Sequence, residues 1–193
     1  DVSLVERWRI SIDSRTGKQI NKVSLVNSCF HERERLPLPY TTGTGKTNYY
    51  GSKTIRVEQM NEGSRLVGQT ENGGIVGTYD FGNADIRYWM FGLDRSYDFY
   101  SSDNTFNDPY QRTAVSVQWG AEQAFEYYHT HHNRNSFDNE GSAIRSLVHV
   151  DNDLDNAFWS RNTMLFGDGS NNNPLVQVDV VAHELTHGVT QYE

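Results

Sequence analysis

The sequence predicts an α+β fold, in which an antiparallel, β-rich N-terminal lobe leads into a helix that carries two histidines. Residues 49–90 contain short runs of β-branched and aromatic residues separated by glycines, which is typical of antiparallel strands joined by turns. Residues 108–132 place apolar side chains at helical spacing after a proline in the first turn. Residues 179–192 repeat a helical pattern, so strands come first and long helices follow.

The beginning of the chain has the pattern of a hairpin followed by a connector. Two stretches of alternating apolar and polar residues lie on either side of turn-forming residues at 13–17. Residues 27–47 combine charged side chains, two prolines and then Thr and Gly, a composition typical of an exposed connector. We therefore predict a hairpin unit at 1–26, a connector or processing region at 27–47, and a lobe at 48–193.

Within the lobe, short β-branched and aromatic runs predict the individual strands. The residues Asn156–Trp159 carry aromatic side chains that would anchor an edge strand. The remaining strands are expected at residues 54–57, 65–67, 74–79, 143–150 and 164–166.

Composition excludes several classes of function. The chain has 193 residues and a formal net charge of −8, from 17 basic and 25 acidic residues, with no basic cluster to bind nucleic acid. Its longest apolar runs are too short to span a membrane. Cys29 is the single cysteine, so no internal disulfide is possible. The chain begins with Asp1 and shows no signal peptide, so we expect a processed chain or a trimmed piece.

The second helical segment carries the motif His-Glu-Leu-Thr-His at 183–187. Residues four apart lie on one face of a helix, so His183 and His187 can bind the same metal ion, for which Zn²⁺ is the usual choice. Glu184 can then reach a metal-bound water as a general base. Histidine is scarce in this chain, with seven residues in all, so a chance match to the motif is rare.

The third metal ligand is not evident within the sequence. A catalytic zinc ion usually has three protein ligands and a water. One extended form of the motif places Gly and His where this chain has Thr190 and Glu193. A continuous helix would put Glu193 about 15 Å from His183. We therefore expect the third ligand beyond residue 193, and the 193-residue chain alone to be an incomplete and inactive fragment.

Seven stretches, in a consistent order and at similar spacing, resemble the thermolysin-like family of neutral zinc metalloendopeptidases. They are Thr42–Lys46, Phe137–Asp138, Ala143–Ser146, Val148–His149, Asn156–Trp159, Phe166–Gly169 and Asp179–His187. The resemblance covers roughly residues 42–193. It implies the N-terminal lobe of a secreted zinc endopeptidase that acts on peptides and proteins and is made as a zymogen. The hairpin at 1–26 resembles the end of the family's propeptide, which would be a partner of the enzyme in the precursor.

The resemblance also assigns roles to individual residues. Asn156 and Ala157 would hold the substrate backbone as an added strand. Asp179 matches a family residue that binds Ca²⁺, although its position in the first helical turn also suits a helix-stabilising carboxylate. A second calcium loop of the family resembles Ser101–Thr105, but the family has Asp and Gln at its two ends, which argues against that site.

Two further clusters have simpler interpretations than metal binding. The histidines at 129, 131 and 132 lie at the end of a predicted helix, where imidazolium ions suit the helix dipole. The aspartates at 151, 153 and 155 resemble the start of an EF-hand loop. That loop requires Gly and Glu where this chain has Asn156 and Asn162.

Two other functions are compatible with the same residues. The chain could be a non-catalytic lobe with a weak two-histidine metal site, or part of another H-E-x-x-H peptidase such as an aminopeptidase. A Glu on a following helix, about 20 residues beyond the motif, would favour the thermolysin-like interpretation.

Overall fold

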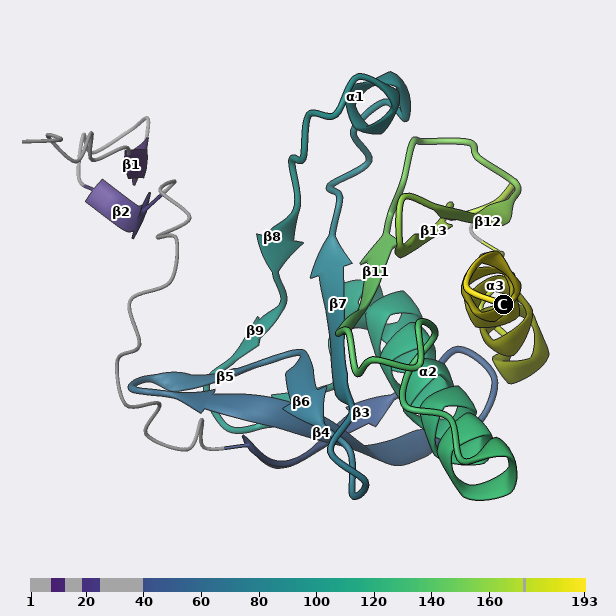
Figure 1. Ribbon diagram of the computed structural model, residues 1–193. Helices are drawn as coiled ribbons and strands as arrows, with labels where there is room; N and C mark the ends of the chain where they lie inside the picture. The colour runs from purple at the N-terminus through teal and green to yellow at the C-terminus, as the bar shows by residue number, and fades with distance from the viewer. Residues whose placement is uncertain (1–7, 13–18, 25–39, 172) are drawn as a thin grey trace, which may run out of the picture. The chain divides into compact units, whose positions relative to one another are not determined.

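A computed structural model describes the backbone of residues 8–12, 19–24, 40–171 and 173–193, and side chains from residue 40 onwards (Figure 1). The chain forms two compact units, residues 1–37 and 38–193. In the first, β1 (Trp8–Ile12) pairs antiparallel with β2 (Gln19–Ser24). This confirms the predicted hairpin pairing, whereas residues 13–18 and 25–39 lie outside the described residues.

The first sheet of the second unit has five strands in the order β10-β3-β4-β5-β9. The β3–β4 pair is antiparallel and joins Thr41 to Val57 in register, while β10 runs parallel to β3. The bounds are β3 Tyr40–Lys46, β4 Ser52–Met60, β5 Gly63–Arg65, β9 Tyr100–Ser101 and β10 Thr105–Phe106.

Residues 40–46, which their composition placed in the connector, form β3 instead. The inward positions of this strand are Gly43 and Gly45, both buried. A Cβ at Gly45 would lie 2.7 Å from the side chain of Val115 on the helix behind the sheet. The Thr and Gly composition that resembled a linker is therefore that of a strand packed too closely for inward side chains.

The second sheet has the order β12-β13-β11-β7-β6, with β8 paired to β7. The strands β7, β11 and β13 run parallel to one another, and β12 is antiparallel to β13. The α+β class is confirmed, and these parallel pairs were not predicted. The bounds are β6 Val67–Gln69, β7 Ile75–Asp80, β8 Tyr97–Asp98, β11 Ile144–Val148, β12 Ala157–Ser160 and β13 Thr163–Phe166.

Both predicted long helices are present: η1 (Pro109–Gln111) continues into α2 (Arg112–His132), and α3 is Val178–Gln191. A short helix, α1 (Arg87–Met90), follows β7. Figure 1 shows α2 running past both sheets, and α2 contacts strands of both sheets as well as α3. The main core therefore surrounds α2. Among the described residues, none of the helices combines the length and apolarity needed to cross a membrane.

Asp108 caps the start of the helical segment formed by η1 and α2. Its Oδ1 accepts a hydrogen bond from the backbone N–H of Tyr110 at 2.8 Å, and Asp108 itself is exposed. Asp108→Ala is expected to lower the free energy of unfolding by about 1 kcal/mol, because a helix N–H loses its acceptor. Denaturant unfolding measures this loss. Asp108→Asn, which keeps an acceptor, should stay within about 0.5 kcal/mol of the parent; an equal loss in both variants would contradict the cap.

Candidate metal centre

The helix α3 is held by an apolar stripe that faces the core. Val181, Leu185 and Val189 are buried and recur every four residues, which places them on one side of the helix. The helix packs against α2, β12 and β13. The neighbouring face carries His183 and His187, both exposed.

The two histidines converge as the motif predicted. His183 Nε2 lies 3.0 Å from His187 Nε2, and together with Glu184 they form a group whose possible ligand atoms all lie within 4.8 Å of one another. Nitrogens this close can both lie at the usual 2.0–2.1 Å from one zinc ion. The donor set therefore fits zinc.

Glu184 supplies a second test of this fit. The residue is buried, and its Oε2 has no hydrogen-bond partner among the described residues. Buried polar atoms nearly always have a partner, so an orphaned carboxylate oxygen beside two converging imidazoles points to a missing water or ligand. The residues present fit a metal ion with a bound water.

Polar contacts from distant parts of the chain fix the orientation of α3. Tyr128 on α2 shares a hydrogen bond of 2.7 Å with Thr186, inside the motif. Trp159 on β12 donates from Nε1 to Gln191 at 2.9 Å. The Trp159 ring also packs directly on Gly188, where a Cβ would come within 2.6 Å of it. These contacts hold α3 against α2 and β12.

Glu193 forms an ion pair with Arg134. Its Oε1 lies 3.3 Å from Arg134 Nη1, and Arg134 Nη2 also donates to the carbonyl of Val189 near the end of α3. The described residues contain no other group of three or more His, Cys, Asp or Glu side chains that could hold an ion. Glu193 is therefore engaged in an ion pair at the end of the helix rather than in the histidine group.

Asn156 and Ala157 lie at the start of an edge strand. Ala157 opens β12 opposite Phe166, and the other side of β12 has no strand partner among the described residues. The Asn156 side chain is exposed, while its carbonyl accepts from the Gly167 N–H at 3.0 Å. Because α3 contacts β12, this edge strand lies beside the helix that carries the two histidines.

The two calcium candidates do not belong to the group of His183, Glu184 and His187. Asp179 is in the first turn of α3, where a negative charge favours the helix N-terminus, and the N-cap residue Gln177 makes no side-chain capping hydrogen bond. In the loop Ser101–Thr105, the Ser101 hydroxyl and the Thr105 N–H both donate to Asp103 Oδ1. The hydrogen bond from Ser101, followed by that from Thr105, holds the pKa of Asp103 below its usual value.

The histidines at 129 and 131 contact different partners, the Phe125 ring and the Tyr127 carbonyl.

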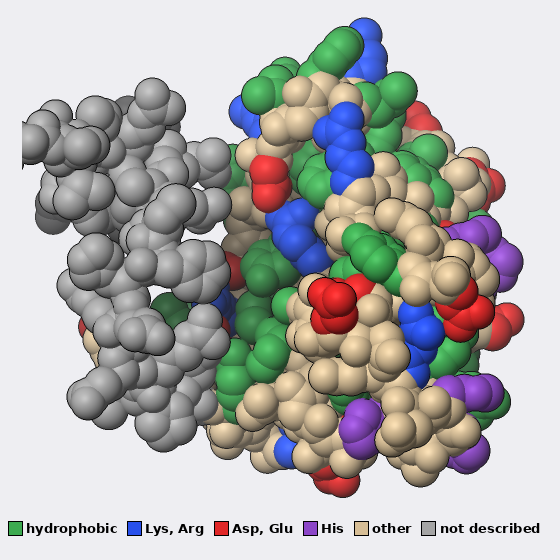
Figure 2. All heavy atoms as spheres, viewed as in Figure 1, with side chains coloured by type: hydrophobic (Ala, Val, Ile, Leu, Met, Phe, Trp, Pro, Cys, Tyr) green, Lys and Arg blue, Asp and Glu red, His purple; other side chains and the backbone are tan. Residues whose placement is uncertain are grey.

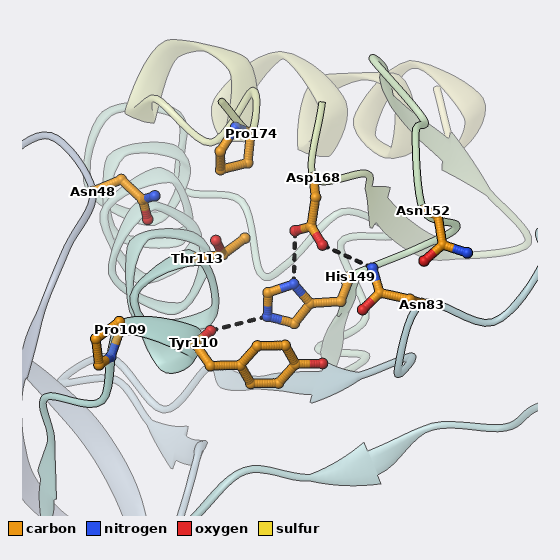
Figure 3. A pocket seen from close by; sticks show the side chains of 9 residues that line it. All are labelled: Asn48, Asn83, Pro109, Tyr110, Thr113, His149, Asn152, Asp168 and Pro174. Atoms are coloured by element: carbon orange, nitrogen blue, oxygen red, sulfur yellow. Dashed lines mark hydrogen bonds and ion pairs between the residues drawn. The ribbon is translucent and has the colours of Figure 1, made fainter. Parts of the chain in front are cut away.

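Sequence reasoning missed a polar cluster that lines a cavity of about 440 Å³ (Figure 3). His149 is 2.6 Å from Asp168 Oδ1 through Nδ1, and 3.0 Å from the Tyr110 carbonyl through Nε2. Asn83 donates to the other oxygen of Asp168 at 2.9 Å. Both ring nitrogens of His149 are therefore in hydrogen-bond contact with oxygen atoms of other residues.

Burial raises the pKa of Asp168, but the hydrogen bond and charge of His149 outweigh it and leave the pKa below its usual value. Because both nitrogens of His149 are engaged in these contacts, we assign the pair a structural role. It ties the end of β11 to η1 and to the loop after β13. No local pattern reveals it, because its members are 19 and 39 residues apart.

Comparison with known proteins agrees with this geometry. Residues 42–191 match the sequence profile of the thermolysin metallopeptidase catalytic domain. The chain is 32% identical to an extracellular elastase of Staphylococcus epidermidis, over 97% of this chain and 35% of that protein. It is 34% identical to a bacillolysin of Bacillus amyloliquefaciens, over 95% of this chain and 33% of that protein. The chain thus spans about a third of the length of these relatives.

Among solved structures, the precursor of protealysin, a metalloproteinase from Serratia proteamaculans, superposes with a TM-score of 0.52. The sequence identity is 26%, and the match covers 65% of this chain and 37% of that chain.

Proposed function

Because the chain belongs to the thermolysin family of metallopeptidases, we propose that the whole protein is a zinc-dependent endopeptidase of peptides and proteins. One observation carries the proposal: two imidazole nitrogens lie 3.0 Å apart beside a buried glutamate whose Oε2 has no partner among the described residues. Relatives named as extracellular proteins support secretion.

The residues of the chain have distinct roles in this proposal. Zinc, when bound, would polarise the scissile carbonyl and make a water acidic enough to react near neutral pH. His183 and His187 would hold the ion through their Nε2 atoms. Glu184 would take the proton of the attacking water at Oε2 and pass it to the leaving nitrogen. The free edge of β12 would pair with the substrate backbone at Asn156 and Ala157.

We place the third zinc ligand outside residues 1–193, which is supported by the pairing of Glu193 with Arg134. It follows that these residues alone would bind zinc less tightly than the whole protein and would lack its activity. Calcium at Asp179 stays a prediction from the family resemblance, since Asp179 belongs to no group of three or more His, Cys, Asp or Glu side chains among the described residues.

Glu193→Gln tests the placement of the third ligand. The substitution is expected to leave the zinc dissociation constant within about twofold of the parent, because it removes an ion-pair partner and no ligand. His187→Ala, which does remove a ligand, should weaken zinc binding by at least about tenfold. Competition with a chromophoric chelator measures both values. A loss with Glu193→Gln as large as that with His187→Ala would make Glu193 the third ligand.

The hairpin at 1–26 is proposed as the end of a propeptide, with maturation between about Ser28 and Thr41. The similarity to a metalloproteinase precursor supports a precursor form. N-terminal sequencing of the mature protein is expected to give a first residue within that interval. A mature protein that begins at Asp1 or earlier would contradict the assignment.

A further inference from the structure

Large apolar side chains are exposed together at one end of the second unit. Tyr88, Met90, Phe91 and Leu93, named here the apical patch, belong to α1 and the turn after it. Phe91 is 78% exposed, Met90 63% and Leu93 53%. Figure 2 shows hydrophobic side chains gathered where α1 lies in Figure 1, with Lys and Arg side chains beside them. Contiguous exposed apolar side chains of this kind mark interaction sites.

The apical patch is presented by a fixed turn. Trp89 is buried beneath it, and its Nε1 donates to Ser160 Oγ at 3.3 Å. Backbone hydrogen bonds join Phe91 to Arg87 and Leu93 to Tyr88. The outward side chains are therefore held in place by a buried anchor and need no rearrangement to receive a ligand.

The same turn is attached to the far end of the edge strand β12. Arg161 follows β12 directly, and its Nη1 and Nη2 donate to the carbonyls of Trp89 and Met90, each at 2.9 Å. The strand runs from Ala157 to Ser160, a distance of about 10 Å at the rise of an extended chain. The proposed substrate-pairing residues thus lie at one end of β12 and the apical patch at the other.

We propose that the apical patch is an extended subsite for the substrate, which binds bulky apolar side chains remote from the scissile bond. The proposal rests on the proposed endopeptidase function. A peptide that pairs with β12 at Ala157 and stays extended beyond Ser160 reaches the patch about four to six residues further along. There, Tyr88, Phe91 and Leu93, together with the ion-paired Asp85 and Arg87, line a hollow of about 270 Å³, large enough for one bulky apolar side chain.

The test uses the whole protein and quenched peptides that share a cleavable core of about six residues. The core is extended at either end by residues that include Phe and Leu, or by Ser and Gly only. The apolar extension at one end is expected to lower KM on the order of tenfold relative to the polar extension. Phe91→Ser combined with Leu93→Ser should bring this ratio of KM values to about one. Tyr127→Ser, which removes an exposed aromatic residue on α2, should keep the parent ratio.

Each other outcome overturns the proposal. An unchanged KM ratio in the double variant, or no preference in the parent, removes the role of the patch while the endopeptidase function stands. Failure of the parent to cleave the core peptide removes the function and the subsite with it. Patch-dependent sedimentation with lipid vesicles, or patch-dependent dimerisation, without an effect on the KM ratio assigns the surface to a membrane or to a second copy.

Discussion

Glu184→Gln is expected to lower kcat/KM of the whole protein on a peptide by at least about 100-fold while zinc stays bound. Gln keeps the size of the side chain and one acceptor oxygen but cannot take a proton from water. His183 and His187 are unchanged, so the metal content should remain that of the parent. Turnover of a quenched peptide, together with metal analysis of the same sample, measures both quantities.

Glu62→Gln is the matched control for this experiment, because Glu62 is an exposed glutamate in the turn between β4 and β5. It should keep parent activity and parent zinc content. Near-parent turnover in Glu184→Gln would remove Glu184 as the base. Loss of zinc together with loss of activity would show instead that Glu184 is needed to hold the ion.

Glu122→Gln is expected to stabilise the fold at alkaline pH. Glu122 on α2 is buried, and its Oε1 accepts hydrogen bonds from the Arg56 N–H at 2.8 Å and from Gln118 Nε2 at 2.9 Å. Burial raises the pKa of this carboxyl to about 7, against partial opposition from those two hydrogen bonds. Gln retains the acceptor oxygen and carries no charge, so it resembles the protonated form of Glu122.

The direction of this effect on the free energy of unfolding follows from proton linkage. Between the ordinary glutamate pKa near 4.5 and the folded pKa of about 7, the unfolded chain has lost its proton while the folded chain keeps it. Glu122 therefore lowers the free energy of unfolding as pH rises through this window, and the whole decrease is present above it. Glu122→Gln should raise the free energy of unfolding by roughly 3 kcal/mol at pH 8, and by about 1 kcal/mol or less at pH 5.

Urea unfolding at both pH values measures this difference, with Glu62→Gln as the exposed control. A gain that does not depend on pH would mean that Glu122 is not protonated in the folded protein near pH 6. A loss of stability at pH 8 would mean that the ionised carboxylate is preferred by its hydrogen-bond donors.

The sequence predicted the parts of this molecule that depend on local spacing. The helices α2 and α3 follow from apolar periodicity, and the pair His183 and His187 follows from helix geometry alone. The strand β3 was missed because its inward positions are glycines, and at Gly45 the small size is required by Val115 on α2. The parallel pairing of β7 with β11 was missed because no local pattern encodes which distant strands become neighbours.

In the metal centre, too, some features follow from local sequence and others depend on residues far away in the chain. The motif placed the metal ligands, but the contacts that orient them come from residues far away in the chain. Tyr128 and Trp159 reach α3 across 58 and 32 residues respectively. The hydrogen-bonded pair of His149 and Asp168 has no periodic signature either. Such partners depend on tertiary packing, which a single sequence does not reveal.

The interior position of β3 has a consequence for the order in which the sheet is assembled. Its partner on one side, β4, follows immediately in the chain, but its partner on the other side, β10, is synthesised about 60 residues later. A nascent chain can therefore form the β3–β4 hairpin early, whereas closing the second side must await a long-range encounter. The Thr44 amide, which bonds to the carbonyl of Asn104 at 2.9 Å, gains its protection from solvent exchange only at that later step.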